Sequence, residues 1–233
     1  MNVDDLVLVH GMHDTRLALR RFNDRPGAFL WPWMGLSLII AVVLLVAVWA
    51  VATLSPADPT PIPLNGVAFD PGLPDYAHIL YRNLLVLALH AMACVAGFMA
   101  GSSLPLSAAN RSGVDRWVHD RAGPLAIAFV TLATLFSLGT QAYAIGGTAA
   151  TIAAQLQVSP GLLMLGLLPH AVPELVALFL PLAAWLIASR QKRWNELLAA
   201  TVVCVGLAVP VLLASAAVEL WASPELMKAI AGA

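Results

Sequence analysis

LWPWMGLSLIIAVVLLVAVWAVATL, residues 30–54, contains no charged side chain. An α-helix rises ~1.5 Å per residue, so about 20 apolar residues cross the ~30 Å hydrocarbon core of a bilayer. The stretch is long enough to do so. It is also much longer than the ~7–15 residue core of a secretory signal, and it begins behind a polar N-terminal segment. We therefore predict a retained membrane helix here, with Trp31 and Trp33 at the headgroup level.

The composition extends this prediction to the rest of the chain. Its 233 residues are 60% hydrophobic and only 11% charged, and the mean hydropathy is +0.84. A soluble domain carries about 25% charged residues. We predict an all-α fold, a polytopic transmembrane helical bundle (residues 29–221) with an N-terminal segment (1–28) and a short C-terminal tail (222–233). It has about five spans, near residues 30–54, 79–100, 124–145, 160–189 and 197–221.

The distribution of Lys and Arg predicts the orientation of the spans. Four basic residues lie in the N-terminal segment, three in the loop 101–123 and three in the turn 190–193, which makes ten of the twelve in the chain. With five spans these ten fall on one side, which the positive-inside rule identifies as cytoplasmic. The N-terminus is then cytoplasmic and the C-terminus lies outside.

Two alternatives concern the fourth apolar stretch. In the first alternative, residues 148–168 and 172–189 are separate crossings and the chain has six spans. The basic turn 190–193 then lies outside, which conflicts with the positive-inside rule. A re-entrant element at 160–168 stays open, because 160–189 is longer than one crossing requires.

Two further segments flank the first span. Residues 3–22 mix apolar and basic side chains at helical spacing, which fits either an amphipathic helix on the inner leaflet, with Arg20 and Arg21 near anionic lipid, or a solvated helix. Residues 55–78 contain six prolines and no Lys or Arg, which predicts an extended outer loop.

Polar side chains inside the spans are candidates for function, because in hydrocarbon they need a partner. The strongest local feature is Pro169-His170-Ala171-Val172-Pro173-Glu174. On a helix His170 and Glu174 lie on one face, at a depth near the midplane, and the two prolines weaken the helix there. The other polar positions in the spans are Arg82, Asn83, His90, Ser137, Thr140, Gln141 and Glu219.

Several interpretations of His170 and Glu174 remain open. They could form a proton relay, an ion site or a polar lock between helices; alternatively, His170 bonds freed backbone while Glu174 is protonated or paired with His90. A zinc site would need a third ligand and only His90 offers one, so we expect neither metal nor cofactor. Arg82 and Glu219 lie at one level and either pair or stay separate.

Small residues and absent motifs complete the sequence pattern. Gly97, Gly101 and Gly139 predict close helix packing. The chain has no phosphate-binding loop, no GxSxG and no HExxH, and its polar membrane residues contain no nucleophile–base pair. We therefore predict that it is not an enzyme. No basic patch is large enough to bind nucleic acid.

A family resemblance rests on these same residues. Three features carry it: Tyr81-Arg82-Asn83 at the start of a span, the glycines named above, and Leu168-Pro169-His170 followed by Glu174. With them the chain resembles the SpoIIM (stage II sporulation protein M) family over about residues 81–221. Members show an early asparagine, a glycine-rich span and a "PHG…E" segment. Here Ala171 replaces the glycine after the histidine, and 144–147 reads Ala-Ile-Gly-Gly, without the family's Asn-Gly pair.

The resemblance implies a membrane scaffold or assembly factor in a prokaryotic cytoplasmic membrane rather than a catalyst. Its partners would be membrane lipid and other membrane or envelope proteins, cell-wall hydrolases among them, and a homo-oligomer stays open. His170 and Glu174 occupy signature positions of the SpoIIM family. The alternative function is a small permease or transporter subunit that uses His90, His170 and Glu174 for ion or proton coupling.

Overall fold

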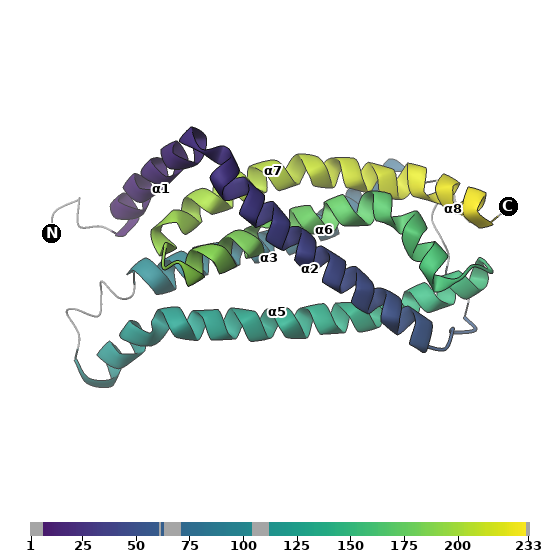
Figure 1. Ribbon diagram of the computed structural model, residues 1–233, viewed down its shortest axis with the longest axis horizontal. Helices are drawn as coiled ribbons and strands as arrows, with labels where there is room; N and C mark the ends of the chain where they lie inside the picture. The colour runs from purple at the N-terminus through teal and green to yellow at the C-terminus, as the bar shows by residue number, and fades with distance from the viewer. Residues whose placement is uncertain (1–6, 61, 63–70, 104–111, 232–233) are drawn as a thin grey trace. The chain divides into compact units, whose positions relative to one another are not determined.

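The fold is all-helical in the part of the chain that the computed structural model describes, residues 7–60, 62, 71–103 and 112–231 (Figure 1). Five of the helical stretches in these residues are long and apolar enough to cross a membrane. The prediction of a polytopic bundle with five spans is confirmed in this respect, and the chain is a multi-pass membrane protein.

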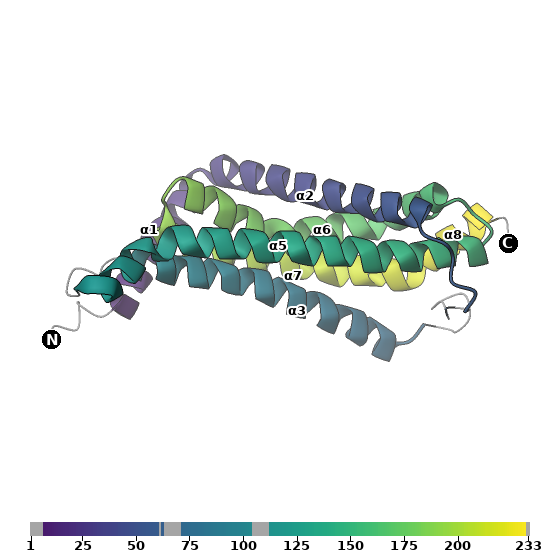
Figure 2. The same cartoon turned by 90° about the horizontal axis from the view of Figure 1, so that it is seen from below.

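Most elements are long single helices, and Figure 2 shows α2, α3 and α5 as uninterrupted ribbons. Short π-helical (η2, η4) and 3₁₀ (η3) turns join or extend them. In chain order the elements are α1 (Val7–Asp24), α2 (Pro26–Leu54), α3 (Leu73–Phe98), η2 (Met99–Ser103), α5 (Gly113–Gln155), α6 (Pro160–Arg190), η3 (Trp194–Glu196), α7 (Leu197–Ala217), η4 (Val218–Ala222) and α8 (Ser223–Ala231).

The chain forms two compact units, and each long helix contributes a part to both. The chain passes from one unit to the other five times, within α2, α3, α5, α6 and α7 in turn, so α1 and α8 belong to different units. Unit 1 comprises Met1–Ser37, Val86–Ala133 and Leu178–Ala208; unit 2 comprises Leu38–Leu85, Thr134–Ala177 and Val209–Ala233.

Several boundaries differ from the predicted ones. α5 continues ten residues past position 145 to Gln155, because the segment 146–155 is rich in alanine, the best helix former, and contains no charge or proline. α6 is one helix from Pro160 to Arg190, so the six-span and re-entrant alternatives for 148–189 are both wrong. The predicted tail after residue 221 is mostly helical, as α8.

The N-terminal helix α1 belongs to the core of unit 1. Ala18 and Phe22 are buried there with Trp33 of α2, and the Phe22 and Trp33 rings meet edge to face with centroids 5.3 Å apart. The remaining members of this cluster come from α6 and α7: Leu180, Ala184, Ala199, Ala200 and Cys204. Both predicted alternatives for this segment, a solvated helix and a helix lying on lipid, are therefore incomplete, because its apolar face is covered by protein.

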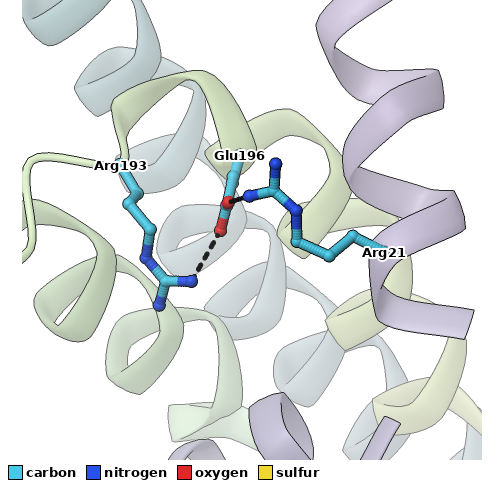
Figure 3. A network of polar contacts seen from close by, with 3 residues as sticks. All are labelled: Arg21, Arg193 and Glu196. Atoms are coloured by element: carbon cyan, nitrogen blue, oxygen red, sulfur yellow. Dashed lines mark hydrogen bonds and ion pairs between the residues drawn. The ribbon is translucent and has the colours of Figure 1, made fainter. Parts of the chain in front are cut away.

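A buried carboxylate fixes α1 to the turn between α6 and α7 (Figure 3). The Glu196 side chain is 5% exposed and forms ion pairs with Arg21 of α1 and with Arg193, whose Nη1 lies 3.1 Å from Glu196 Oε2. The Arg193 guanidinium also lies over the Phe29 ring, 5.5 Å from its centroid. Direct contact between α1 and this turn requires both to lie on the same side of a membrane, which agrees with the four crossings predicted between them.

Two of the three predicted packing glycines allow close contact between helices in unit 1. A Cβ on Gly97 would lie within 3 Å of the Trp185 indole, and one on Gly101 would overlap the Trp194 ring. No atom of the described structure lies within 4 Å of a Cβ placed on Gly139. The packing role predicted for Gly139 is therefore wrong within this chain, because its side of α5 faces open space.

Unit 2 has its own small core, in which α8 takes part. Ala52, Ala149, Leu163 and Met227 are buried together in one cluster, and Gly146 lets α5 approach α2, since a Cβ there would lie 2.6 Å from Val51. The C-terminal helix is thus packed on α5 and α6 and is not a free tail.

The start of the predicted outer loop is ordered against α5. The Asp58 amide donates a hydrogen bond to Thr151 Oγ1 at 3.0 Å, and the Thr60 amide donates one to the Asp58 carboxylate at 2.7 Å. This second bond holds the pKa of Asp58 below its usual value. Residues 61 and 63–70 lie outside the described part, and α3 begins at Leu73, inside the predicted loop.

Replacing the buried carboxylate tests whether it holds α1. Glu196→Ala leaves the Arg21 and Arg193 guanidinium groups without their shared anion. We expect α1 to open more easily, by roughly 2 kcal/mol, a value reduced from that of a fully buried pair because Arg21 is 60% exposed. Amide hydrogen exchange across residues 7–24 measures this. The matched control is Glu225→Ala, which removes an exposed pair with Lys228; equal exchange in both variants would contradict the assignment.

Candidate functional site

Unit 2 contains a cavity of about 210 Å³ that three ionisable side chains line. His170 and Glu174 come from α6 and Glu219 from the π-helical turn η4. The other walls are apolar residues of α2, α5 and α6: Leu44, Leu45, Val48, Ile145, Ala149, Met164, Leu167, Ala171 and Leu175. The cavity is therefore a mainly apolar space within the membrane-spanning part of the chain, with its polar groups concentrated on α6 and η4.

The local sequence explains how these groups reach one cavity. His170 and Glu174 are four residues apart, so a helix presents both on one face, and α6 stays helical across Pro169 and Pro173. The prolines themselves line a separate hollow with Pro210 of α7. A π-helical turn changes the register of side chains and is common at functional sites; here it carries Glu219.

His170 has a specific polar partner. The side chain is 8% exposed, and its Nδ1 lies 2.7 Å from Ser223 Oγ, at the start of α8. The hydrogen bond links two helices of unit 2. At Nδ1 the partner is a hydroxyl group rather than the freed backbone that was one of the predicted alternatives. Ser223 was not singled out from the sequence, although Ser-Pro-Glu at 223–225 is typical of a helix start.

Glu174 and Asn83 lie close enough to interact, but they do not complete each other's hydrogen bonds. Glu174 Oε2 and Asn83 Nδ2 are buried, and neither has a partner with normal geometry in the described structure. A buried polar atom left unpaired costs about 1–3 kcal/mol. The adjoining cavity has room for water molecules that would satisfy such atoms.

Arg82 supplies the positive charge of this region. It interacts electrostatically with Glu174 and with Glu219. No ion pair of 4 Å or less joins it to either carboxyl group in the residues that the structure describes. The predicted Arg82–Glu219 pair is thus a longer-range attraction rather than a direct contact.

Two predicted residues are engaged elsewhere. His90 belongs to unit 1, where its Nδ1 lies 2.8 Å from the Leu178 carbonyl oxygen and its ring 5.6 Å from that of Phe179. These contacts account for His90 without Glu174. Gln141 does not line the cavity; its Nε2 donates a hydrogen bond to Ser137 Oγ at 3.0 Å on the same helix.

The ionisable groups that line the cavity can make polar contacts and can bind protons, water or small ions. Among the described residues, no group of three or more His, Cys, Asp or Glu side chains is placed to hold a metal ion. His170 Nδ1 is occupied by a serine hydroxyl, and the cavity beside the two carboxyl groups is lined mainly by apolar side chains.

Comparisons with protein-family models, curated proteins and solved structures gave no match. The resemblance to the SpoIIM family therefore remains a prediction that rests on the motif residues.

Removing the hydroxyl of Ser223 tests the link between α6 and α8. Ser223→Ala leaves His170 Nδ1 buried without a partner, which should lower the free energy of unfolding by about 1–3 kcal/mol. Thermal melting of the purified chain in detergent measures the change. Ser112→Ala, at an exposed position, is the control, and identical melting of the two variants would show that the bond contributes nothing.

Proposed function

We propose that this chain is an integral membrane scaffold or assembly factor resembling the SpoIIM family, in a prokaryotic cytoplasmic membrane with its N-terminus inside. The observation that carries the proposal is the use made of the signature residues. His170 of α6 is bonded to Ser223 of α8, and Glu174 of α6 lies beside Asn83 of α3. Within unit 2 the His170–Ser223 bond joins two helices directly, which is the task of a structural polar contact in a membrane.

The size of the cavity supports the same proposal. Sites for small organic molecules are usually about 300–1,000 Å³, whereas this cavity measures about 210 Å³. It suits ordered water or a small ion better than a transported metabolite. A scaffold needs no larger space.

The partners of such a scaffold would meet it at its polar ends and along its lipid-facing helices. Partners on the inner side would meet α1, which exposes Arg16 and Arg20, and the exposed Arg25 that follows it. Proteins of the envelope, including cell-wall hydrolases, are the partners that the resemblance implies. The chain itself would position these proteins and catalyse nothing.

A second candidate is a small permease or transporter subunit that couples to protons or ions. The observation that favours it is the pair of carboxyl groups, Glu174 and Glu219, at a cavity inside a membrane-spanning unit. Ionisable residues at such places often mark the path of an ion. This candidate assigns to Glu174 a change of protonation during transport, whereas the scaffold assigns it a fixed contact.

Glu174→Gln separates the two candidates, because glutamine keeps the shape and hydrogen bonding of the side chain but cannot ionise. For a scaffold, we expect the variant to recover the same partners from native membranes by affinity purification, and wild-type proteoliposomes to conduct protons no faster than empty vesicles. The matched control is Glu225→Gln, at an exposed carboxylate. A wild-type proton flux that Glu174→Gln alone abolishes, with partner recovery unchanged, would replace the scaffold by the transporter subunit.

A further inference from the structure

A second cavity of unit 2 lies where α2 ends, apart from the one that His170 and Glu174 line. It measures about 580 Å³, within the range of about 300–1,000 Å³ that is usual for sites of small organic molecules. Six of its ten described lining residues carry a hydroxyl or a carboxylate. They are Ser55, Asp58 and Thr60, which follow α2, and Tyr143, Thr148 and Thr151 of α5. The cavity therefore has a polar lining that the proposed function does not use.

The cavity lies at the edge of the membrane. The candidate spans Pro26–Leu54 and Ile127–Gln155 have 29 residues each, which is roughly 43 Å at ~1.5 Å per residue. That length exceeds the ~30 Å hydrocarbon core of a bilayer and is close to the ~40–45 Å that includes the headgroups. The Asp58 amide donates a hydrogen bond to Thr151 Oγ1, so the ends of the two helices lie together at the headgroup level. Both lipid headgroups and dissolved molecules are present at this depth.

Three of the five hydroxyl groups in this lining already use their hydrogens. The Thr148 hydroxyl donates to a carbonyl oxygen of its own preceding turn at 3.0 Å, and the Thr151 hydroxyl does the same at 3.3 Å. The Thr60 hydroxyl bonds to the Asp58 carboxylate. A carboxylate accepts hydrogen bonds only, and its two oxygens have more acceptor sites than Thr60 fills. The lining therefore suits a ligand that donates hydrogen bonds.

The charge of the lining favours a cation. Asp58 is the one charged side chain among the described residues that line the cavity, and residues 55–78 contain no Lys or Arg. The described residues offer no group of three or more His, Cys, Asp or Glu to a metal ion. Tyr143 is 75% exposed, and the face of such a ring attracts an organic cation. A carboxylate, acceptor oxygens and an aromatic ring together fit an organic ammonium ion.

We propose that this cavity binds an organic ammonium group through the Asp58 carboxylate, the Thr148 hydroxyl oxygen and the Tyr143 ring. An ammonium group is positively charged and donates hydrogen bonds without accepting any, so it matches both properties of the lining. Two sources present this group at the membrane surface, the headgroup of an ethanolamine phospholipid and a dissolved amine. The inference goes beyond the proposed function and does not depend on it.

Binding to the full chain in an uncharged detergent tests the proposal for both sources. Ligand-observed NMR compares ethanolamine, acetate and glycerol, which are all small and differ in charge, and we expect ethanolamine alone to bind. Native mass spectrometry of the same preparation compares phosphatidylethanolamine with phosphatidylglycerol, and we expect the first to be retained more strongly. A preference for the ammonium compound in either comparison supports the proposal and identifies the source.

Two pairs of variants locate the binding. Asp58→Asn keeps the shape of the side chain and removes its charge, so affinity for the ammonium compound should fall about tenfold. Its control is Asp75→Asn, because Asp75 also accepts a backbone N–H, from Gly72 at 2.9 Å, but does not line the cavity. Tyr143→Leu should weaken binding about twofold to fivefold. Phe136→Leu, at an equally exposed position of the same helix, should leave binding unchanged.

Three results overturn the proposal. The first is that neither ammonium compound binds better than its anionic or neutral counterpart. The second is an unchanged affinity in Asp58→Asn, or an equal loss in Asp75→Asn. The third is equal binding by Tyr143→Leu and Phe136→Leu, which decides the question alone if Asp58→Asn does not fold. Each of them leaves the Glu174→Gln test of the scaffold unaffected, because Glu174 lines the other cavity.

Discussion

The absence of water from the hydrocarbon core is the constraint on which the structure depends. Every backbone N–H and C=O inside it must be paired within the chain, which restricts the spanning elements to helices. The five long helices satisfy this requirement, and the main departures from regular α-helix, η2, η3 and η4, lie at or beyond the ends of α3, α6 and α7. The same constraint gives each polar side chain in these helices a cost that some partner must offset.

The partners that the structure provides are different in the two units. In unit 1 the main polar contact is made by Glu196, which forms ion pairs with two arginines. These pairs join the N-terminal helix to the α6–α7 turn. In unit 2 the His170–Ser223 bond connects α6 and α8, and Glu174 of α6 lies near Asn83 of α3. Both sets join segments far apart in the sequence. They explain how a chain with alanine-rich cores keeps its helices in register, since small residues provide close approach but little directional preference.

The sequence predicts the number and rough position of the spans because each is a long apolar run with at most one charged side chain, and a run of that length and composition is typical of a membrane helix. It does not predict where helices stop in uncharged but less apolar segments such as 146–155, since hydropathy measures insertion and not helix formation. The docking of α1 depends on the fit of Phe22 against Trp33, and the partner of His170 on a serine 53 residues away. Neither contact leaves a periodic pattern. Of the candidate site, His170 and Glu174 were found from their spacing and prolines, whereas Ser223 was missed.

The number of crossings is tested most directly by the sidedness of two exposed positions. Thr60 follows the first span and Gln191 lies in the turn between α6 and α7; both are exposed. In intact cells, a membrane-impermeant thiol reagent should label Thr60→Cys, and it should label Gln191→Cys only after lysis. Labelling of both positions in intact cells would place the turn on the far side from α1, which the contact between Glu196 and Arg21 forbids, and would contradict the five-span account.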